Sequence, residues 1–488
     1  MGRTIMCFLL VTTALLLHAQ TKVEWVSSTQ TELWKHNQDL IAAPASDMYS
    51  VEIDQNGTLQ TVEGFGTCFN EAGWTSLSLL NEIDRENIFK ELFAPGAGAN
   101  FTICRMPVGA NDFSRDWYSY DETDGDFDMR NFSIANDKET LIPFIKNAQK
   151  YNPALKLWAS PWSPPSWMKY NKHYALKSLQ KGITNIKSDE WGIDFNGIDN
   201  GLKPEQEGKE GTNMFIQEDQ YFKAYSLYFA KFIRAYRNEN INISMVMPQN
   251  EFNSAQPFPS CTWTANGLAK FLDYLGPKMN ALNVKVFFGT MERPDGKLVD
   301  TILPDAISKN YVQGVGFQWA GKDAIAGIHK KYPDLTLYQS EQECGNGKND
   351  WEYSKYAWGL MKHYFNNGVS AYMYWNTSLL QNSISRWGWK QNSLISVDAT
   401  TKTYKYNYDY YVLKHLSHYV KPGARLLSTT GSFSNLLAFV NPDKSVVVML
   451  QNEKSFQDTI IIKIGNKIVT ARLEPDSFNS FVIHQNKF

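Results

Sequence analysis

The sequence contains few cysteines, and their spacing matches no common metal site. Only 5 cysteines occur among 488 residues, and Cys7 lies in an apolar segment near the N-terminus. The other four form no Cys-x-x-Cys pair and have no histidines at zinc spacing. They are Cys68, Cys104, Cys261 and Cys344. We therefore expect no metal and no cofactor. Buried free thiols are favoured over a disulfide, although an oxidising compartment would permit one.

The sequence also lacks a charge bias and a membrane-spanning run. Lys and Arg number 48 against 50 Asp and Glu, and a formal charge of -2 excludes the basic surface that nucleic-acid binding requires. The longest apolar run, from Ile5 to Leu17, is shorter than the about 20 residues needed to cross a bilayer. It follows Arg3 and precedes small Ala19, which is typical of a signal peptide at residues 1–19. We therefore expect a soluble protein that is exported, whether secreted, periplasmic or at the cell surface, and has no membrane span.

Eight short apolar runs, separated by segments of helical character, divide the middle of the chain. The runs cover residues 61–69, 101–108, 155–160, 243–247, 284–288, 312–317, 335–338 and 369–375. Between them, residues 221–236 repeat aromatic and apolar side chains at the spacing of one helix face. This alternation predicts parallel strands and a (β/α)8 TIM barrel over residues 60–420. The polar insertion at residues 169–215 follows the third strand, and we expect it to loop over the face where catalytic groups lie.

The chain changes to an all-β character after about Pro422. Five β-branched runs separated by turns cover residues 436–440, 446–450, 459–464, 468–473 and 478–483. Five strands need partners to complete a sandwich, and the segment from Val23 to about Ser50 could supply them. We therefore predict a β-sandwich that combines residues 421–488 with an N-terminal segment at residues 20–59.

Two glutamates follow apolar runs in the same manner. Glu251 comes after the fourth predicted strand, in Met-Pro-Gln-Asn-Glu, and Glu341 after the seventh, in Leu-Tyr-Gln-Ser-Glu. Because the strand ends of a barrel face one cavity, the count brings the two carboxyl groups together. An acid that faces a carboxylate is the minimum needed to cleave a glycosidic bond with retention of configuration. Glu343 would point to the same strand face as Glu341, so spacing alone does not identify the nucleophile.

Six motifs, in barrel order, resemble those of glycoside hydrolase family 30, which contains glucosylceramidase-like and β-1,6-glucanase-like retaining β-glycosidases. No single motif is decisive, but six in register are specific. They are Gly-Phe-Gly-Thr-Cys-Phe-Asn-Glu at 64–71, Cys-Arg-Met-Pro at 104–107, Ala-Ser-Pro-Trp-Ser-Pro-Pro at 159–165, Gln-Asn-Glu at 249–251, Ser-Glu at 340–341 and Tyr-Trp-Asn at 374–376.

The resemblance implies roles for the charged and amide side chains. Glu251 would be the acid/base and Glu341 the nucleophile, which leaves Glu343 as a supporting or surface acid. Arg105 would donate hydrogen bonds to the nucleophile and keep it ionised. Asn250 would bind the 2-hydroxyl of the sugar. A strand-end salt bridge would account for an isolated Asn-Glu pair, and for Arg105 as well.

The resemblance also implies a sugar subsite. Glu71 would bind distal sugar hydroxyls, Trp162 would line the same subsite, and Trp375 would form its floor by stacking on a sugar ring. Core packing is the competing interpretation for each tryptophan. Gln318 and Trp319 end the sixth strand, where the glucosylceramidase-type pattern has a histidine and a tryptophan.

Ala320 stands where that pattern has a tyrosine, which favours a β-1,6-glucan or oligosaccharide over a glucosylceramide-like lipid. We therefore predict a secreted retaining β-glycosidase that acts on β-glucosidic bonds of a carbohydrate substrate. Xylanase, β-fucosidase and β-galactosidase activities remain open, and so does a non-catalytic carbohydrate-binding protein on the same barrel. A binder has no need of an acid facing an ionised carboxylate, so the intact glutamate motifs favour an enzyme. The sequence predicts no oligomeric state.

Overall fold

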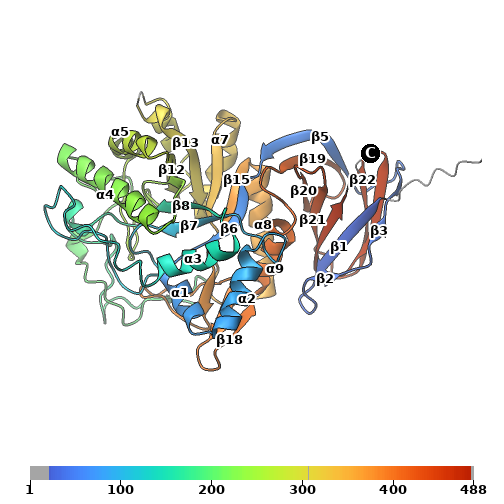
Figure 1. Cartoon of the computed structure of the whole chain (residues 1–488), viewed down its shortest axis with the longest axis horizontal. Helices are drawn as coiled ribbons and strands as arrows, with labels where there is room; N and C mark the ends of the chain where they lie inside the picture. The colour runs from blue at the N-terminus through green and yellow to red at the C-terminus, as the bar shows by residue number, and fades with distance from the viewer. Residues whose placement is uncertain (1–20, 306, 485–488) are drawn as a thin grey trace, which may run out of the picture.

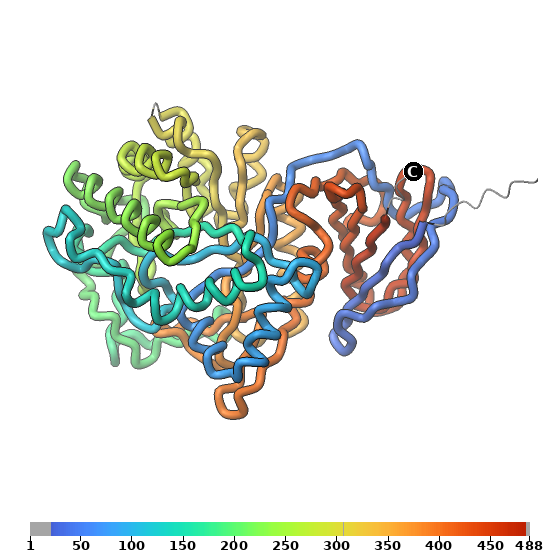
Figure 2. The backbone as a smooth tube through the Cα atoms, in the orientation of Figure 1, coloured from blue at the N-terminus to red at the C-terminus, as the bar shows by residue number. Residues whose placement is uncertain are grey.

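A barrel and a β-sandwich lie side by side in the computed structural model, which describes residues 21–305 and 307–484 (Figure 1). The signal peptide predicted at residues 1–19 lies outside the described residues. Figure 2 shows the N-terminal segment running among the C-terminal strands before the chain enters the barrel. The predicted fold class, a TIM barrel with a sandwich built from both ends of the chain, is confirmed. Across the described residues, no helix is long and apolar enough to cross a membrane.

Eight parallel strands close the barrel in the order β11-β12-β13-β14-β15-β6-β7-β8. They are β6 (Gly64–Cys68), β7 (Ile103–Pro107), β8 (Lys156–Ser160), β11 (Met245–Val246), β12 (Lys285–Met291), β13 (Val312–Gln318), β14 (Thr336–Glu341) and β15 (Val369–Asn376). Each overlaps one predicted apolar run, because a parallel strand covered on both faces needs apolar residues throughout. Strand β11 is the shortest, so Glu251 lies in the turn beyond it rather than at its end.

Helices surround the barrel and present apolar stripes to it. They are α1 (Glu71–Ser78), α2 (Glu82–Phe93), α3 (Leu141–Tyr151), α4 (Asp219–Asn238), α5 (Ala265–Ala281), α6 (Lys297–Ile302), α7 (Ile325–Lys331), α8 (Trp351–Asn366) and α9 (Tyr408–Ser417). In α4, Phe222, Tyr225 and Phe229 are buried on one face, as their spacing predicts. Side-chain oxygens of Asn70 and Asp350 accept from backbone amides and so begin α1 and α8.

The sandwich is a sheet in the order β2-β1-β24-β21-β20-β19-β5-β22-β23-β4, with β3 also paired to β1. Its strands are β1 (Lys22–Ser28), β2 (Lys35–His36), β3 (Leu40–Ile41), β4 (Ala43–Pro44), β5 (Val51–Thr61), β19 (Arg425–Gly431), β20 (Leu436–Val440), β21 (Val446–Asn452), β22 (Asp458–Ile464), β23 (Lys467–Leu473) and β24 (Ser477–Ile483). The N-terminal contribution therefore continues past Ser50 to Thr61. The sequence hides β5 and β19 because polar Gln, Asn, Ser and Thr residues interrupt their apolar pattern.

Two small sheets lie outside the barrel and the sandwich. The insertion at residues 169–215 contains a hairpin of β9 (Lys187–Ser188) and β10 (Ile193–Asp194). The second sheet consists of β16 (Ser378–Leu380), β17 (Ile395–Asp398) and β18 (Thr403–Tyr406) and follows the last barrel strand.

Helices α8 and α9 join the barrel to the sandwich (Figure 1). Phe365 of α8 packs edge-on against Phe439 of β20 with ring centroids 5.5 Å apart. Trp358, on the same helix, donates from Nε1 to Asn435 Oδ1 at 2.8 Å. One continuous apolar core includes the barrel and the facing side of the sandwich, while a second core fills the sandwich itself. The two parts therefore share buried surface.

A chain cut down to residues 60–420 is expected to be insoluble or inactive. The cut exposes the apolar face of α8 around Phe365 and removes the strands that cover it. Expression of that chain beside the full-length protein, followed by thermal melting and activity assay, tests this. Full activity with an unchanged melting temperature would contradict a shared core.

His415 of α9 is expected to make the joint between the two parts sensitive to acid. Its ring nitrogens lie 2.8 Å from Ser480 Oγ and 2.9 Å from Ser28 Oγ, and the side chain is fully buried. Burial, followed by the charge of Lys414, lowers its pKa to about 3. Between about pH 6.5 and the lowered pKa of His415, the unfolded chain binds a proton that the folded chain does not. The free energy of unfolding therefore falls as the pH falls through this range.

The slope from this group alone approaches about 1.4 kcal/mol per pH unit. Denaturant unfolding at pH 7 and pH 5 should therefore show a smaller loss of stability for His415→Gln than for the parent chain. An identical loss in both proteins would contradict the assignment.

Candidate active site

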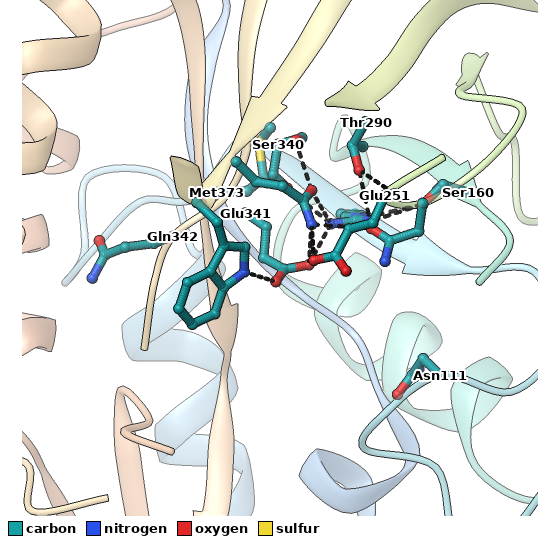
Figure 3. Close-up of polar contacts among 12 residues, drawn as sticks. Asn111, Ser160, Glu251, Thr290, Ser340, Glu341, Gln342 and Met373 are labelled. Atoms are coloured by element: carbon teal, nitrogen blue, oxygen red, sulfur yellow. Dashed lines mark hydrogen bonds and ion pairs between the residues drawn. The ribbon is translucent and has the colours of Figure 1, made fainter. Parts of the chain in front are cut away.

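Glu341 and Glu251 face each other at the carboxyl-terminal mouth of the barrel, joined by the side chain of Gln318 (Figure 3). Glu341 is the last residue of β14 and Gln318 the last of β13. Gln318 Nε2 donates to Glu251 Oε1 at 3.0 Å and to Glu341 Oε2 at 3.3 Å. The barrel thus brings together the two glutamates that the sequence separates.

Arg105, on β7, forms an ion pair with the Glu341 carboxylate. Its Nη1 lies 2.8 Å from Glu341 Oε2, and the guanidinium is fully buried. The same side chain donates to Ser160 Oγ at 2.8 Å and to Asn250 Oδ1 at 2.6 Å. On the other side, Trp319 Nε1 donates to Glu341 Oε1 at 3.0 Å. Both oxygens of Glu341 therefore accept hydrogen bonds, one of them from a cation.

Glu251 has fewer partners. Its backbone amide donates to Thr290 Oγ1 at 3.0 Å, and its backbone adopts a left-handed φ of 47°. Such a conformation is unfavourable for a glutamate and places the side chain where a regular strand would not. Among the described residues, Glu251 Oε2 has no hydrogen-bond partner although it is buried. This oxygen remains available to a bound molecule.

The environment separates the acidities of the two glutamates. Burial, followed by the charge of Glu292, raises the pKa of Glu251 well above its usual range. Burial also raises the pKa of Glu341, but the Arg105 charge and the Trp319 hydrogen bond oppose that rise. A proton shared by this site therefore lies on Glu251, and Glu341 carries the negative charge.

The structure distinguishes Glu341 from Glu343, which the spacing alone did not. Glu343 lies beyond the end of β14, and its carboxylate binds Lys322 Nζ at 2.8 Å and accepts from Tyr356 Oη at 2.6 Å. Neither partner is shared with Glu251. Glu343 thus lines the outer pocket rather than facing the acid.

A pocket of about 490 Å³ opens above these groups. Aromatic and apolar side chains form much of its wall: Trp162, Trp191, Ile193, Phe258, Trp319, Tyr353, Tyr356 and Trp389. In the part of the chain that the structure describes, every charged residue of this lining is acidic: Asp112, Glu190, Glu251, Glu292, Glu341 and Glu343. Flat rings beside hydrogen-bond acceptors suit an uncharged polyhydroxylated molecule.

Besides Arg105, four of the predicted binding residues lie around the glutamates. Trp162 and Trp319 line the pocket, Gln318 donates to both carboxylates, and Asn250 Oδ1 accepts from Arg105 and Gln318. Trp375 lies nearby but does not line the pocket: it stacks under Trp162 at 5.1 Å and is fully buried. Its Nε1 has no partner among the described residues, and its stacking on a sugar ring stays a prediction.

Glu71 is also absent from the pocket lining. As the first residue of α1, it is buried and bound at 3.0 Å by both Arg115 Nε and Asn136 Nδ2. Its carboxylate therefore stabilises the loop that follows β7. The expectation that Glu71 binds sugar hydroxyls does not fit this placement, because a protein cation already occupies its oxygens.

Three acidic residues of the pocket lining were missing from the sequence prediction: Asp112, Glu190 and Glu292. Asp112 lies in the loop after β7, and its buried Oδ1 has no partner among the described residues. Glu292 follows β12 directly, as Glu341 ends β14. A glutamate at the end of another apolar run was a signal that the sequence offered.

Glu292→Gln is expected to move the alkaline limb of the pH–rate profile to lower pH. The Glu292 charge raises the pKa of Glu251, so removing it lets Glu251 lose its proton at a lower pH. The pH dependence of kcat/KM for the parent and the variant measures this. An unchanged alkaline limb would show that Glu292 does not act on the acid.

The described ranges, 21–305 and 307–484, contain no cluster of His, Cys, Asp or Glu suited to a metal ion. The four cysteines in these ranges are buried free thiols, and burial raises the pKa of Cys104 and Cys261 to about 12.

A barrel that sets Glu251 opposite an arginine-bound Glu341 in an aromatic pocket has the arrangement of a glycosidase. Comparisons with known proteins agree. The model of the glycosyl hydrolase family 30 TIM-barrel domain matches residues 62–190 and 202–420, and that of the family 30 beta sandwich domain matches residues 423–481. The chain belongs to glycosyl hydrolase family 30.

Two individual relatives share between a quarter and a third of their aligned residues with this chain. "Putative glucosylceramidase 1" of Caenorhabditis elegans is 28% identical over 454 residues, which are 87% of this chain and 80% of that protein. Endo-1,6-beta-D-glucanase BGN16.3 of Trichoderma harzianum is 25% identical over 452 residues, 87% of this chain and 84% of that protein. The solved structure of the endo-beta1,6-glucanase BT3312 covers 95% of this chain and 100% of its own, with a TM-score of 0.76 at 24% identity. That likeness establishes the shared fold.

Proposed function

We propose that the chain is an exported, retaining β-glycosidase that hydrolyses β-glucosidic bonds in a neutral glucan of the β-1,6-linked type. Glu341 is the nucleophile and Glu251 the acid/base. Export rests on the signal-like segment at residues 1–19.

The bridging amide of Gln318 is the observation that carries the proposal. Because one nitrogen contacts both carboxylates, the bonded oxygens of Glu251 and Glu341 can be no farther apart than the sum of 3.0 and 3.3 Å. Inverting enzymes separate their carboxyl groups by about 6.5 Å or more to admit a water molecule, whereas retaining enzymes use about 5 to 5.5 Å. The geometry supports direct attack by a glutamate.

The reaction then takes two steps. The Glu341 carboxylate attacks the anomeric carbon while Glu251 Oε2, unpartnered in the protein, gives its proton to the departing glycosidic oxygen. The bond to the leaving group breaks and an ester to Glu341 forms. In the second step Glu251 takes a proton from water, which attacks the same carbon and releases Glu341.

The pocket lining supports a neutral substrate. In the described chain this lining has acidic but no basic side chains, so a uronate or sulfate on the sugar would find no cation there to pair with. The names of relatives point to β-glucosides: endo-1,6-beta-D-glucanases and glucosylceramidases. Ala320, in place of the tyrosine of the glucosylceramidase-type pattern, favours the glucan.

Glucosylceramide is the second candidate, because the relatives named glucosylceramidase include the C. elegans protein at 28% identity. Hydrolysis of 4-nitrophenyl β-glucoside, β-1,6-linked and β-1,3-linked gluco-oligosaccharides and glucosylceramide in detergent distinguishes the candidates. We expect the β-1,6-linked oligosaccharide to give the highest kcat/KM among the natural substrates. Inactivity on every β-glucoside would revive a carbohydrate-binding role or activity on another β-glycoside.

A further inference from the structure

The β9–β10 hairpin is attached to the barrel mouth by backbone hydrogen bonds. Asp194 N donates to Gly388 O at 2.8 Å, and Lys390 N donates to Gly192 O at 2.7 Å. Between them Ile193 forms an antiparallel bridge with Trp389. The insertion after the third barrel strand and the loop after the eighth thus meet edge to edge and form one wall.

Glycines permit this close approach. Gly192 has φ +63°, and a Cβ built there would lie 2.1 Å from Lys390 O. Gly388 has φ +89°, and its Cβ would lie 2.6 Å from Asp194 O. Both positions need the left-handed backbone and the missing side chain. The hairpin is therefore held in one place rather than hanging loose over the pocket.

This wall carries aromatic rings to the outer part of the pocket. Trp191, at the tip of the hairpin, lines the pocket yet is 63% exposed. Trp389 lines the same region, and Phe195 packs edge-on against it at 5.8 Å. The buried Trp389 Nε1 has no partner among the described residues. A large exposed ring beside a fixed one offers an apolar face and leaves a donor for a hydroxyl.

Trp191 does not belong to the machinery around the glutamates. The carboxylate pair is held by groups on the barrel strands, such as Arg105, whereas Trp191 comes from the inserted hairpin and donates from its backbone amide to Ser188 Oγ. Substituting Trp191 therefore leaves the carboxylate pair intact.

We propose that Trp191 and Trp389 form a subsite for a second sugar of the glucan, beyond the sugar held between the two glutamates. The inference rests on the proposed β-glucosidase activity and makes the hairpin the part of the protein that selects oligosaccharides over short glucosides. The acidic Glu190 beside Trp191 accepts hydrogen bonds from hydroxyls of that sugar.

Trp191→Ala should raise KM for a β-1,6-linked glucotetraose roughly tenfold, the loss expected for one ring contact. For 4-nitrophenyl β-glucoside, which carries a single sugar, kcat/KM should stay within about twofold of the parent value. Trp191→Phe keeps an aromatic face and should recover most of the tetraose affinity. Ile186→Ala is the matched control, because Ile186 is a 57% exposed apolar residue of the same insertion that does not line the pocket.

Equal changes on both substrates, or none on either, would overturn the second subsite. So would Ile186→Ala with the same selective loss, because the effect would then belong to the insertion as a whole. A parent enzyme that cleaves neither substrate would count against the proposed function itself. The two failures are therefore distinguishable in one set of assays.

Discussion

Glu341→Gln should abolish turnover of every β-glucoside, with a fall in kcat of about 10⁴-fold or more. A neutral amide cannot form the ester through which the sugar passes, and the Arg105 charge that holds the carboxylate then has no anion to pair with. The loss should not depend on the leaving group, because the step removed is the attack itself. Steady-state rates on aryl glucosides and on the glucan measure it.

Glu343→Gln is the control for that variant. Its carboxylate is already occupied by Lys322 and Tyr356, so its loss should leave most of the activity. If Glu343→Gln were inactive and Glu341→Gln nearly normal, the assignment of the nucleophile would be reversed.

Glu251→Gln should divide substrates by their leaving groups. Hydrolysis of the glucan should fall about 10²- to 10⁴-fold, because a sugar alkoxide cannot depart without a proton. Aryl glucosides with acidic phenols need no such proton, so their first step should persist and the glycosyl-enzyme should accumulate. Added azide should then restore turnover by attacking that intermediate in place of activated water.

The expected product of the azide reaction is a β-glucosyl azide, since two displacements restore the original configuration. Equal losses on glucan and aryl substrates, with no response to azide, would argue against an acid/base role for Glu251.

Most of the barrel could be predicted from the sequence for a specific physical reason. Parallel strands covered on both faces must be apolar throughout, so runs such as residues 369–375 and 312–317 mark them clearly. Strand β5 has one face open to solvent along much of its length, with Asp54, Asn56 and Thr61 among its exposed positions, and the same criterion misses it. Local composition therefore identified the barrel better than the sandwich.

The sequence could predict those residues of the site that lie at the carboxyl ends of barrel strands. Glu251, Glu341 and Arg105 meet because the carboxyl ends of β11, β14 and β7, which are not adjacent in the closed barrel, face one cavity. Glu343 required the structure, because only the end of β14 turns it away toward Lys322. The depth of Trp375 also required the structure, because a sequence does not show that it is fully buried against Trp162.

Covalent trapping tests the central claim most directly. The protein would be incubated with an activated 2-deoxy-2-fluoro-β-glucoside, whose fluorine slows the second step, and its intact mass and peptides would then be measured. The expected result is a mass increase of one fluoroglucosyl unit, carried by the peptide that contains Glu341 and located on that residue by fragmentation. Failure to form an adduct while the enzyme still cleaves β-glucosides, or an adduct on Glu343 or Glu251, would contradict it.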